Sequence, residues 1–320
     1  GLYSLPQFLT LFFNPLTAIK ITFLFFAAVG YFGFYFLLRR NFRTDKSFAV
    51  LGATLFLFNG FYAHRMIIGH PFHAFMLLPY LAILLLIKPS RPQSFFNKNN
   101  IYSITLAGAI LAYMFHSAMM HIIPPVVLSV AVILLIHAYL YGGDKKIWLR
   151  ALTAGIVSIG LSISKLVAAF SFLKNVPRDI YPIPGFHNLF DAINITIRSL
   201  FFRPPADLTM ELIVNSQWAI RQHELEFGIT WVPLIVILIA IIWYIYLILK
   251  KQAEFIPSKR AAIYLGTIIL LLSLPIAVNI YNPSWNKLLK SIPVIKNSFL
   301  MLRWFAAYIP VSILAAVLIL

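Results

Sequence analysis

The sequence contains no cysteine, so disulfide bonds, cysteine-held iron–sulfur clusters and thiol chemistry are excluded within this chain. Charged residues are scarce as well, at 11% of the 320 residues. A soluble domain carries about a quarter charged residues, so a soluble globular fold is excluded too. Acidic residues are the scarcest charged type, with 9 Asp and Glu against 26 Lys and Arg and a formal net charge of +17. We expect no nucleic-acid partner from this charge, because lysine and arginine also orient membrane-spanning segments.

Apolar residues are abundant instead: they make up 61% of the chain, and the mean hydropathy is +0.87. They form long runs, without the alternation of a transmembrane β-barrel strand. The sequence therefore predicts an all-α fold, a polytopic transmembrane helical bundle that makes residues 1–320 a single integral membrane domain. Because the chain starts at Gly1 and ends within an apolar run at Leu320, we expect an internal fragment of a longer protein. About nine spans are expected, at residues 16–38, 47–63, 73–88, 101–115, 122–141, 148–170, 227–249, 261–280 and 298–320.

The loops between these spans alternate in charge. Four short loops are rich in lysine and arginine, which predicts a cytoplasmic location by the positive-inside rule; they are residues 39–46, 88–100, 142–150 and 250–260. The remaining loops are then extracytoplasmic, at residues 64–72, 116–121, 171–226 and 281–297. Most of the histidines, and most of the acids, lie in or beside this second set. Polar chemistry is therefore expected on the extracytoplasmic face.

The loop 171–226 is too long for a simple connection, and long loops usually have a function. Part of it has apolar residues at helical spacing, which predicts an amphipathic helix. The apolar face contains Phe186, Leu189, Phe190, Ile193, Ile197, Leu200 and Phe201, and the opposite face His187, Asn188, Asp191, Asn194 and Arg198. Two interpretations stay open: the helix lies on the outer leaflet of the membrane, or it caps the bundle without contacting lipid.

Several histidines of the outer face are candidate ligands of a divalent metal, which needs two to four such side chains to converge. The candidates are His70, His73, His121, His223 and Glu226. A haem held by two histidines is an alternative, with His70 or His73 on one side and His116 or His121 on the other. No pattern of two histidines bracketing a glutamate, as in zinc proteases, is present.

An anion-binding site is the third interpretation of the outer face. Arg65 lies in an otherwise non-basic outer loop, and Arg303 lies about 8 Å inside the last predicted span, at 1.5 Å per residue. A charge within a span is costly, so such residues usually serve a site. Arginine can bind phosphate through two parallel hydrogen bonds, and histidine can donate to phosphate or sugar hydroxyls. The candidate binding residues are His64, Arg65, His70, His116, Glu224 and Arg303.

Two long stretches carry a resemblance to a known family. They are FNPLTAIKITFLFFAAVGYFGFYFLLRR and FAVLGATLFLFNGFYAHRMIIGHPFHAFMLLPYLAILLL. They combine an asparagine–proline before the first span, a paired arginine at its end, and a turn with glycine and histidine followed by proline. In this order of features the chain resembles the GT-C superfamily of polytopic glycosyltransferases, with the bacterial YfhO-like proteins as the most similar branch. The segment SIPVIKNSFLMLRWFAAYIP adds a weaker similarity near the last span.

The resemblance implies a glycosyltransferase that uses a polyprenyl-phosphate-linked sugar donor on the extracytoplasmic face of the bacterial inner membrane. Its acceptor would be a glycan, a lipid or a protein. The family's usual catalytic acid lies in the first outer loop, but residues 1–15 contain no Asp or Glu. The expected catalytic residue would therefore lie before Gly1.

Other interpretations of the sequence stay open beside this one. The chain fits an inactive relative of these enzymes, a transporter of lipid-linked glycans, or a non-catalytic subunit of a membrane complex with a bound metal or haem. The predicted spans contain few charges apart from Lys165 and Arg303, which disfavours ion-coupled transport. Membrane lipid is the expected partner in every case, and membrane-complex partners are expected in the last.

Overall fold

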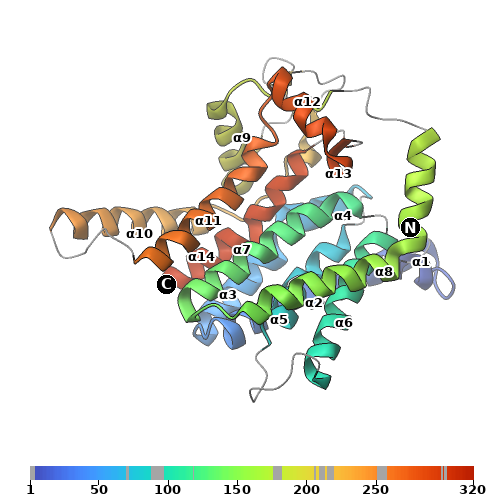
Figure 1. Cartoon of the computed structure of the whole chain (residues 1–320), viewed down its shortest axis with the longest axis horizontal. Coiled ribbons are helices and arrows are strands. Elements are labelled where there is room, and N and C mark those ends of the chain that lie inside the picture. The colour runs from blue at the N-terminus through green and yellow to red at the C-terminus, as the bar shows by residue number, and fades with distance from the viewer. Residues whose placement is uncertain are drawn as a thin grey trace.

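The computed structural model describes residues 4–69, 72–87, 97–117, 119–175, 182–204, 207–208, 213–214, 220–250, 258–296, 298 and 301–320. Helices dominate the described chain (Figure 1), namely α1 (Leu5–Leu9), α2 (Pro15–Phe36), α3 (Lys46–Leu57), α4 (Gly60–Ile67), α5 (Leu78–Leu86), α6 (Lys98–His116), α7 (Ile123–Tyr141), α8 (Lys145–Asn175), α9 (Leu189–Phe201), α10 (Val232–Leu249), α11 (Lys259–Ala277), α12 (Pro283–Ser291), α13 (Pro293–Lys296) and α14 (Tyr308–Ile319). Shorter helical turns are η1 (Leu37–Asn41), η2 (His73–Leu77), η3 (Met120–Ile122), η4 (Gln222–Glu224) and η5 (Leu302–Ala307). The strands are β1 (Gly185–Phe186), β2 (Asp207–Leu208), β3 (Ile213–Val214) and β4 (Ile220–Arg221).

Among the residues that the structure describes, seven helical stretches are long and apolar enough to cross a membrane, which confirms a helical, membrane-spanning protein. They are Pro15–Asn41, Lys46–Ile67, Met120–Tyr141, Lys145–Phe172, Val232–Leu249, Lys259–Ala277 and Leu302–Ile319. The predicted span 73–88 corresponds to a shorter apolar helix, His73–Leu86. The predicted span 101–115 lies within α6, whose asparagines, tyrosines and terminal histidine lower its hydropathy. Each predicted span thus coincides with a helix, and the count of nine membrane crossings stays a prediction.

Asparagine side chains fix where many of these helices begin. The side-chain oxygen of Asn14 accepts a hydrogen bond from the Thr17 backbone N–H at 2.9 Å, and Pro15 follows at the first helical position. Such a cap satisfies a backbone donor that has no partner within the helix. The same arrangement starts α4, α6, α9 and α12, with caps at Asn59, Asn97, Asn188 and Asn282.

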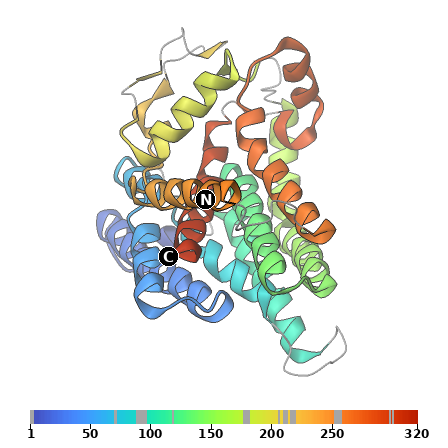
Figure 2. The same cartoon turned by 90° about the vertical axis from the view of Figure 1, so that its left-hand side faces the viewer.

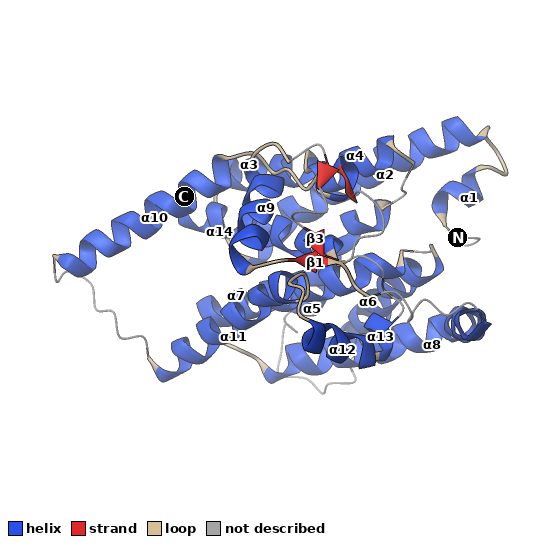
Figure 3. Ribbon diagram, turned by 90° about the horizontal axis from the view of Figure 1, so that it is seen from above, coloured by secondary structure: helices blue, strands red, loops and turns tan. Residues whose placement is uncertain are grey.

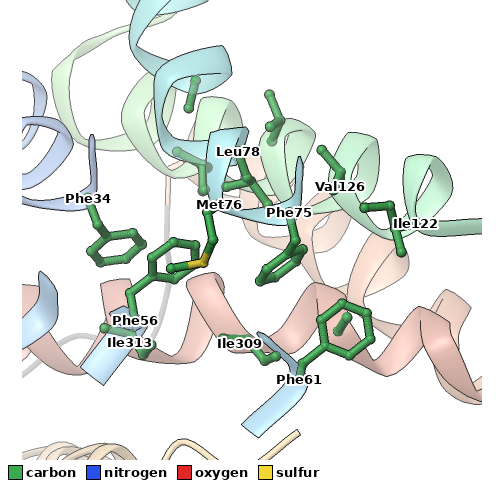
Figure 4. Close-up of a cluster of buried hydrophobic side chains, with 14 of the residues drawn as sticks. Phe34, Phe56, Phe61, Phe75, Met76, Leu78, Ile122, Val126, Ile309 and Ile313 are labelled. Carbon is green, nitrogen blue, oxygen red and sulfur yellow. The ribbon is translucent and has the colours of Figure 1, made fainter. Parts of the chain in front are cut away.

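The core of the bundle is built from phenylalanine rings on helices far apart in the sequence (Figure 4). The ring of Phe34 stacks on Phe56 with centroids 4.7 Å apart, and Phe75 contacts both Phe56 and Phe61. Ile309, at the start of α14, lies beside Phe61 in the same cluster. This packing joins α2, α3, α4, η2 and α14 and fixes the position of α4, on which the candidate site residues His64 and Arg65 lie.

The four predicted cytoplasmic loops begin or end at one end of the bundle. Tyr141 donates a hydrogen bond to the Phe42 carbonyl at 2.6 Å, which joins the end of α7 to the turn after η1. The buried Arg150 donates to the carbonyl of Ile87, the residue before the loop 88–100. The first turns of α11 pack beside Gly143. The described ends of these four basic loops therefore lie at one end of the bundle, as expected for loops that share one membrane face.

The predicted loop 171–226 contains α9 and short strands that lie beside the bundle (Figures 2 and 3). β1 pairs antiparallel with β3, and β2 pairs antiparallel with β4. Phe186 also exchanges backbone hydrogen bonds with the residues after α11: its N–H donates to Asn279, and its carbonyl accepts from Tyr281. The described parts of this loop are therefore held against the end of α11.

Contact between α6 and α8 depends on a glycine, and this generates a stability prediction. A Cβ added at Gly108 would lie 2.8 Å from the Val157 Cβ and 3.0 Å from the Ala154 carbonyl oxygen. We expect Gly108→Ala to destabilise the protein by about 1–3 kcal/mol because the helices must separate. Gly155→Ala on α8 is the matched control, since its added methyl group meets no described atom within 4 Å. Unfolding in detergent measures both, and equal effects would contradict the close approach.

Candidate anion-binding site

One carboxylate, that of Glu224, lies between two guanidinium groups. Arg65 donates from Nη2 to Glu224 Oε2 at 2.9 Å. Arg303 donates from Nε to Oε2 at 3.0 Å and from Nη2 to Oε1 at 2.6 Å, so this second pair is bidentate. Bidentate pairs of this kind are among the stronger side-chain hydrogen bonds. Three of the six predicted binding residues are thus brought together.

The three residues come from distant parts of the chain. Arg65 lies near the end of the short helix α4, Glu224 ends the turn η4, and Arg303 follows Leu302 in η5. Glu224 is 159 residues from Arg65 and 79 residues from Arg303. Only the folded bundle can therefore create this cluster.

Aromatic rings enclose the two arginines. The guanidinium carbon of Arg65 lies 4.9 Å from the Phe61 ring centre and 5.1 Å from that of Phe72, and Arg303 lies 5.3 Å from Phe72. A cation over an aromatic face is stabilised by the negative potential of the ring. Phe72 thus contacts both cations, while the Phe61 ring stacks on Phe72 at 5.5 Å.

The two arginines differ in exposure, and this difference decides which can meet a ligand. Arg65 is fully buried, and its Nε and Nη1 have no hydrogen-bond partner among the described residues. The Arg303 side chain is 19% exposed. Two guanidinium groups and one carboxylate leave a net charge of +1. Because Arg65 is enclosed and paired, the surplus positive charge is accessible at Arg303.

Glu224 is held in its ionised form. Burial raises the pKa of its carboxyl group, but hydrogen bonds and charges from Arg303 and Arg65 outweigh burial and hold that pKa well below its ordinary range. The carboxylate therefore stays charged at neutral pH. It acts as the counter-charge of the buried arginine, and it is a poor candidate for accepting a proton in a reaction.

The segment that carries Glu224 is fixed by backbone hydrogen bonds on both sides. The Gly228 carbonyl accepts from the Gly60 N–H at 2.7 Å, and the N–H of Ile229 donates to Leu200, in α9, at 2.7 Å. The ring of Phe227 stacks on Phe61 with centroids 5.6 Å apart. Gly60 allows the close approach, because a Cβ there would lie 2.9 Å from the Gly228 nitrogen. The segment therefore joins α4 to α9 beside the ion cluster.

Two predicted histidines lie at the edge of the cluster. His223 Nε2 is 3.5 Å from Glu224 Oε1, and the His223 side chain is partly exposed. The exposed His121 ring meets Phe72 edge-on at 6.4 Å between centroids. Both rings can therefore reach a ligand that contacts Arg303.

Other predicted site residues have different surroundings. His64 is half-buried on α4, and none of the described hydrogen bonds or ion pairs of the cluster involves it. His116 Nε2 is 3.0 Å from the Leu161 carbonyl of α8, so it contributes to helix packing. Glu226 accepts a hydrogen bond from Gln222 at 3.4 Å. His70 lies outside the described residues.

His73 is buried within the bundle. Its Nε2 lies 2.7 Å from the Tyr113 hydroxyl, and its ring packs on Phe26 with centroids 4.5 Å apart. The same hydroxyl accepts a hydrogen bond from the Leu5 N–H at 3.1 Å. In this arrangement Nε2 of His73 is engaged in structural bonding and not directed at a metal or haem.

No group of three or more His, Asp or Glu side chains that could hold a metal ion occurs within the described ranges. The paired arginines also disfavour a cation beside Glu224, because like charges repel. A divalent metal bound by His70, His73, His121, His223 or Glu226 therefore stays a prediction.

The sequence interpretation missed the aromatic part of the site. Phe61 and Phe72 were available in the stretch FNGFYAHRMIIGHPFHAF, four residues before and seven residues after Arg65. Spacing of i and i+4 places Phe61 and Arg65 on one helix face, which is a signal that sequence alone contains. Phe72 has no such regular relation to Arg65.

Comparisons with protein-family models, with curated proteins and with solved structures gave no match to this chain.

The ion cluster generates a prediction about stability. Glu224→Ala should destabilise the protein by about 3–5 kcal/mol, because it leaves Arg65 buried without a counter-charge. The double variant Arg65→Met with Glu224→Leu should recover most of that loss, since apolar residues can replace a buried pair. Unfolding midpoints in detergent measure both. Glu226→Ala is the matched control and should lie within about 0.5 kcal/mol of wild type; a Glu224→Ala variant as stable as this control would show that the cluster does not hold the fold.

Proposed function

We propose that the protein is an integral membrane glycosyltransferase, similar to the GT-C superfamily, in which Arg303 binds the phosphate of a polyprenyl-phosphate-linked sugar. The observation that carries the proposal is the net positive charge of the cluster, accessible at the partly exposed Arg303. Glu224 engages only the Nε and one Nη2 donor of Arg303. The guanidinium group has five N–H donors, so the Nη1 edge is available for phosphate.

The geometry supports a role in stabilising the leaving group. In glycosyl transfer the acceptor hydroxyl attacks the anomeric carbon, and the bond from that carbon to the donor phosphate oxygen breaks. The departing polyprenyl phosphate gains one negative charge, and the acceptor proton passes to a general base. A preorganised guanidinium beside the departing oxygen stabilises this charge. Glu224 is not assigned as that base, because it is engaged with both arginines.

The surroundings of Arg303 suit the other parts of such a donor. His121 and His223, at the edge of the cluster, can donate hydrogen bonds to phosphate or sugar hydroxyls. The acceptor is a glycan, a lipid or a protein, and membrane lipid surrounds the bundle. In this proposal Arg65 does not contact the donor, since it is buried behind Phe61 and Phe72.

We also propose that the cluster faces the extracytoplasmic side of a bacterial inner membrane. The basic loops at the opposite end of the bundle support this orientation. In the same proposal all nine predicted spans cross the membrane, and residues 171–226 form an extracytoplasmic loop.

A non-catalytic role is the second candidate, and one observation favours it. Every described hydrogen bond of the cluster is internal and joins α4, η4 and η5, as in a structural clamp. An inactive relative of these enzymes, a subunit of a membrane complex or a transporter of lipid-linked glycans would each be consistent with such a clamp.

Arg303 provides the functional test. Arg303→Ala should nearly abolish transfer from a polyprenyl-phosphate sugar by purified full-length protein, because the phosphate loses its cation. Arg303→Lys keeps the positive charge but lacks the planar guanidinium group that binds phosphate through two hydrogen bonds. This variant should therefore transfer sugar more slowly than wild type but faster than Arg303→Ala. Because Arg303 also binds Glu224, the unfolding midpoint of each variant is measured alongside activity.

Arg260→Ala is the matched control, since Arg260 lies at the opposite end of the bundle, near the start of α11, and its loss should not change transfer. Full activity of a folded Arg303→Ala variant would remove Arg303 from the site. Absence of transfer by wild type with every polyprenyl-phosphate sugar tested would favour the non-catalytic candidate.

The orientation of the protein in the membrane is tested separately. Because the chain has no native cysteine, only the introduced cysteine can react. Single cysteines replacing Asn188 and Ser284, both exposed and in predicted outer loops, should react with a membrane-impermeant thiol reagent applied from outside the cell. A cysteine replacing Ser94, in a predicted cytoplasmic loop, should react only after the membrane is permeabilised. The reverse pattern would overturn the proposed extracytoplasmic position of the site.

A further inference from the structure

Helix α9 has two apolar faces instead of the one that its sequence predicts. One face packs on the protein and includes Ala192 and Ile195, both buried. The second face is exposed and consists of Leu189, Phe190, Ile193 and Ile197, with Phe190 76% exposed. Residues spaced by four lie on one side of a helix, so these four side chains form one apolar ridge. The exposed Asn194 and Arg198 follow on the adjoining side of the helix.

Backbone hydrogen bonds hold the end of α9 near the start of the membrane-spanning helix α10. The N–H groups of Phe227 and Ile229 donate to the carbonyls of Ser199 and Leu200, at the end of α9. Trp231 caps the start of α10 two residues after Ile229, and its side chain is exposed. The end of α9 therefore lies close to the point at which α10 begins.

Helix α10 marks where lipid surrounds the protein. Its 18 residues are almost entirely apolar, and only 6% of them are buried. At 1.5 Å per residue its length is about 27 Å, close to the thickness of about 30 Å of a bilayer's hydrocarbon core. Trp231 precedes α10, and Tyr246 with Lys250 above its ring lies at the other end. Tryptophan, tyrosine and lysine at span ends are typical of the two membrane boundaries.

The direction of α9 suits a helix that lies along a membrane surface. Figures 1 and 3 show α9 beside the start of α10 and running across its direction, and α9 contacts both α10 and α11. Helix α9, which carries the ridge, is thus next to two spans with exposed apolar surfaces. The basic residues Arg198 and Arg203, both exposed, lie at the end of the same helix. Arginine beside an apolar ridge is complementary to anionic lipid headgroups over acyl chains.

We infer that α9 is a membrane-docking helix whose ridge of Leu189, Phe190, Ile193 and Ile197 lies in the acyl-chain boundary of one leaflet, with Arg198 and Arg203 at the lipid phosphates. Lipid is the occupant that the geometry favours, because α9 adjoins two apolar spans whose surfaces are largely exposed. The inference concerns the surface of the protein and does not depend on the proposed enzyme activity.

Spin labelling tests the position of the ridge in the full chain. Single cysteines replace Phe190 and Ile193 on the ridge, Asn194 beside it, and Ile242 on the exposed surface of α10. Each variant carries a nitroxide and is reconstituted into vesicles of phosphatidylglycerol and phosphatidylethanolamine. Relaxation by oxygen, which concentrates in acyl chains, is compared with relaxation by a water-soluble nickel chelate.

Labels at 190 and 193 should resemble the label at 242, with several-fold higher oxygen accessibility than nickel accessibility relative to the label at 194. Equal nickel accessibility at 190 and 194 would show that the ridge faces water and would overturn the inference. Protection of 190 and 193 from both reagents would show that protein covers the ridge, which overturns it as well. Because the readout needs no substrate, failure of the glycosyltransferase proposal leaves this result unaffected.

Discussion

An arginine buried inside a helical bundle is tolerated only with a counter-charge, and here the counter-charge comes from 159 residues further along the chain. The pairing of Arg65 with Glu224 therefore constrains more than two side chains. It fixes the segment after η4, which binds Gly60 on one side and the end of α9 on the other. The same segment leads into α10, so the ion pair lies close in the chain to the start of that span.

The two arginines of the cluster have different roles. Arg65 is enclosed by two aromatic rings and neutralised by Glu224, so it acts as a structural cation. Glu224 in turn holds one edge of Arg303, which limits the rotamers of that long side chain. A guanidinium held in advance loses less conformational entropy when it binds an anion. In the proposed function, burial of Arg65 with Glu224 thus positions Arg303 for an anion.

The positions of the helices followed from the sequence because hydrophobic runs and asparagine caps are local signals. All nine predicted spans coincide with helices, and 73–88 corresponds to the shorter apolar helix His73–Leu86. Arg65, Glu224 and Arg303 were recognisable as unusual charges. Their mutual pairing was not predictable, because nothing local in the sequence brings η4 to α4. For the same reason the bonds of Arg303 to Glu224, of His116 to Leu161 and of His73 to Tyr113 could not be predicted from the sequence.

In helix α9, some apolar side chains are covered by protein and others are exposed on the surface. Its sequence suggested a choice between the leaflet and the bundle, because periodicity reports which residues avoid water but not what replaces it. In the structure Leu200 and Ile195 are covered by protein while Phe190 is not. Only the neighbouring backbone could distinguish these two faces.

The contact between Gly60 and Gly228 has an evolutionary consequence. Any side chain at position 60 would meet the Gly228 nitrogen at 2.9 Å, so the position is closed to other amino acids while the segment keeps its path. A distant relative that retains this architecture should therefore keep a glycine five residues before its buried arginine, even where the surrounding apolar residues have diverged. Such a spacing, together with a glutamate in a later loop, offers a way to find homologous proteins that overall similarity does not detect.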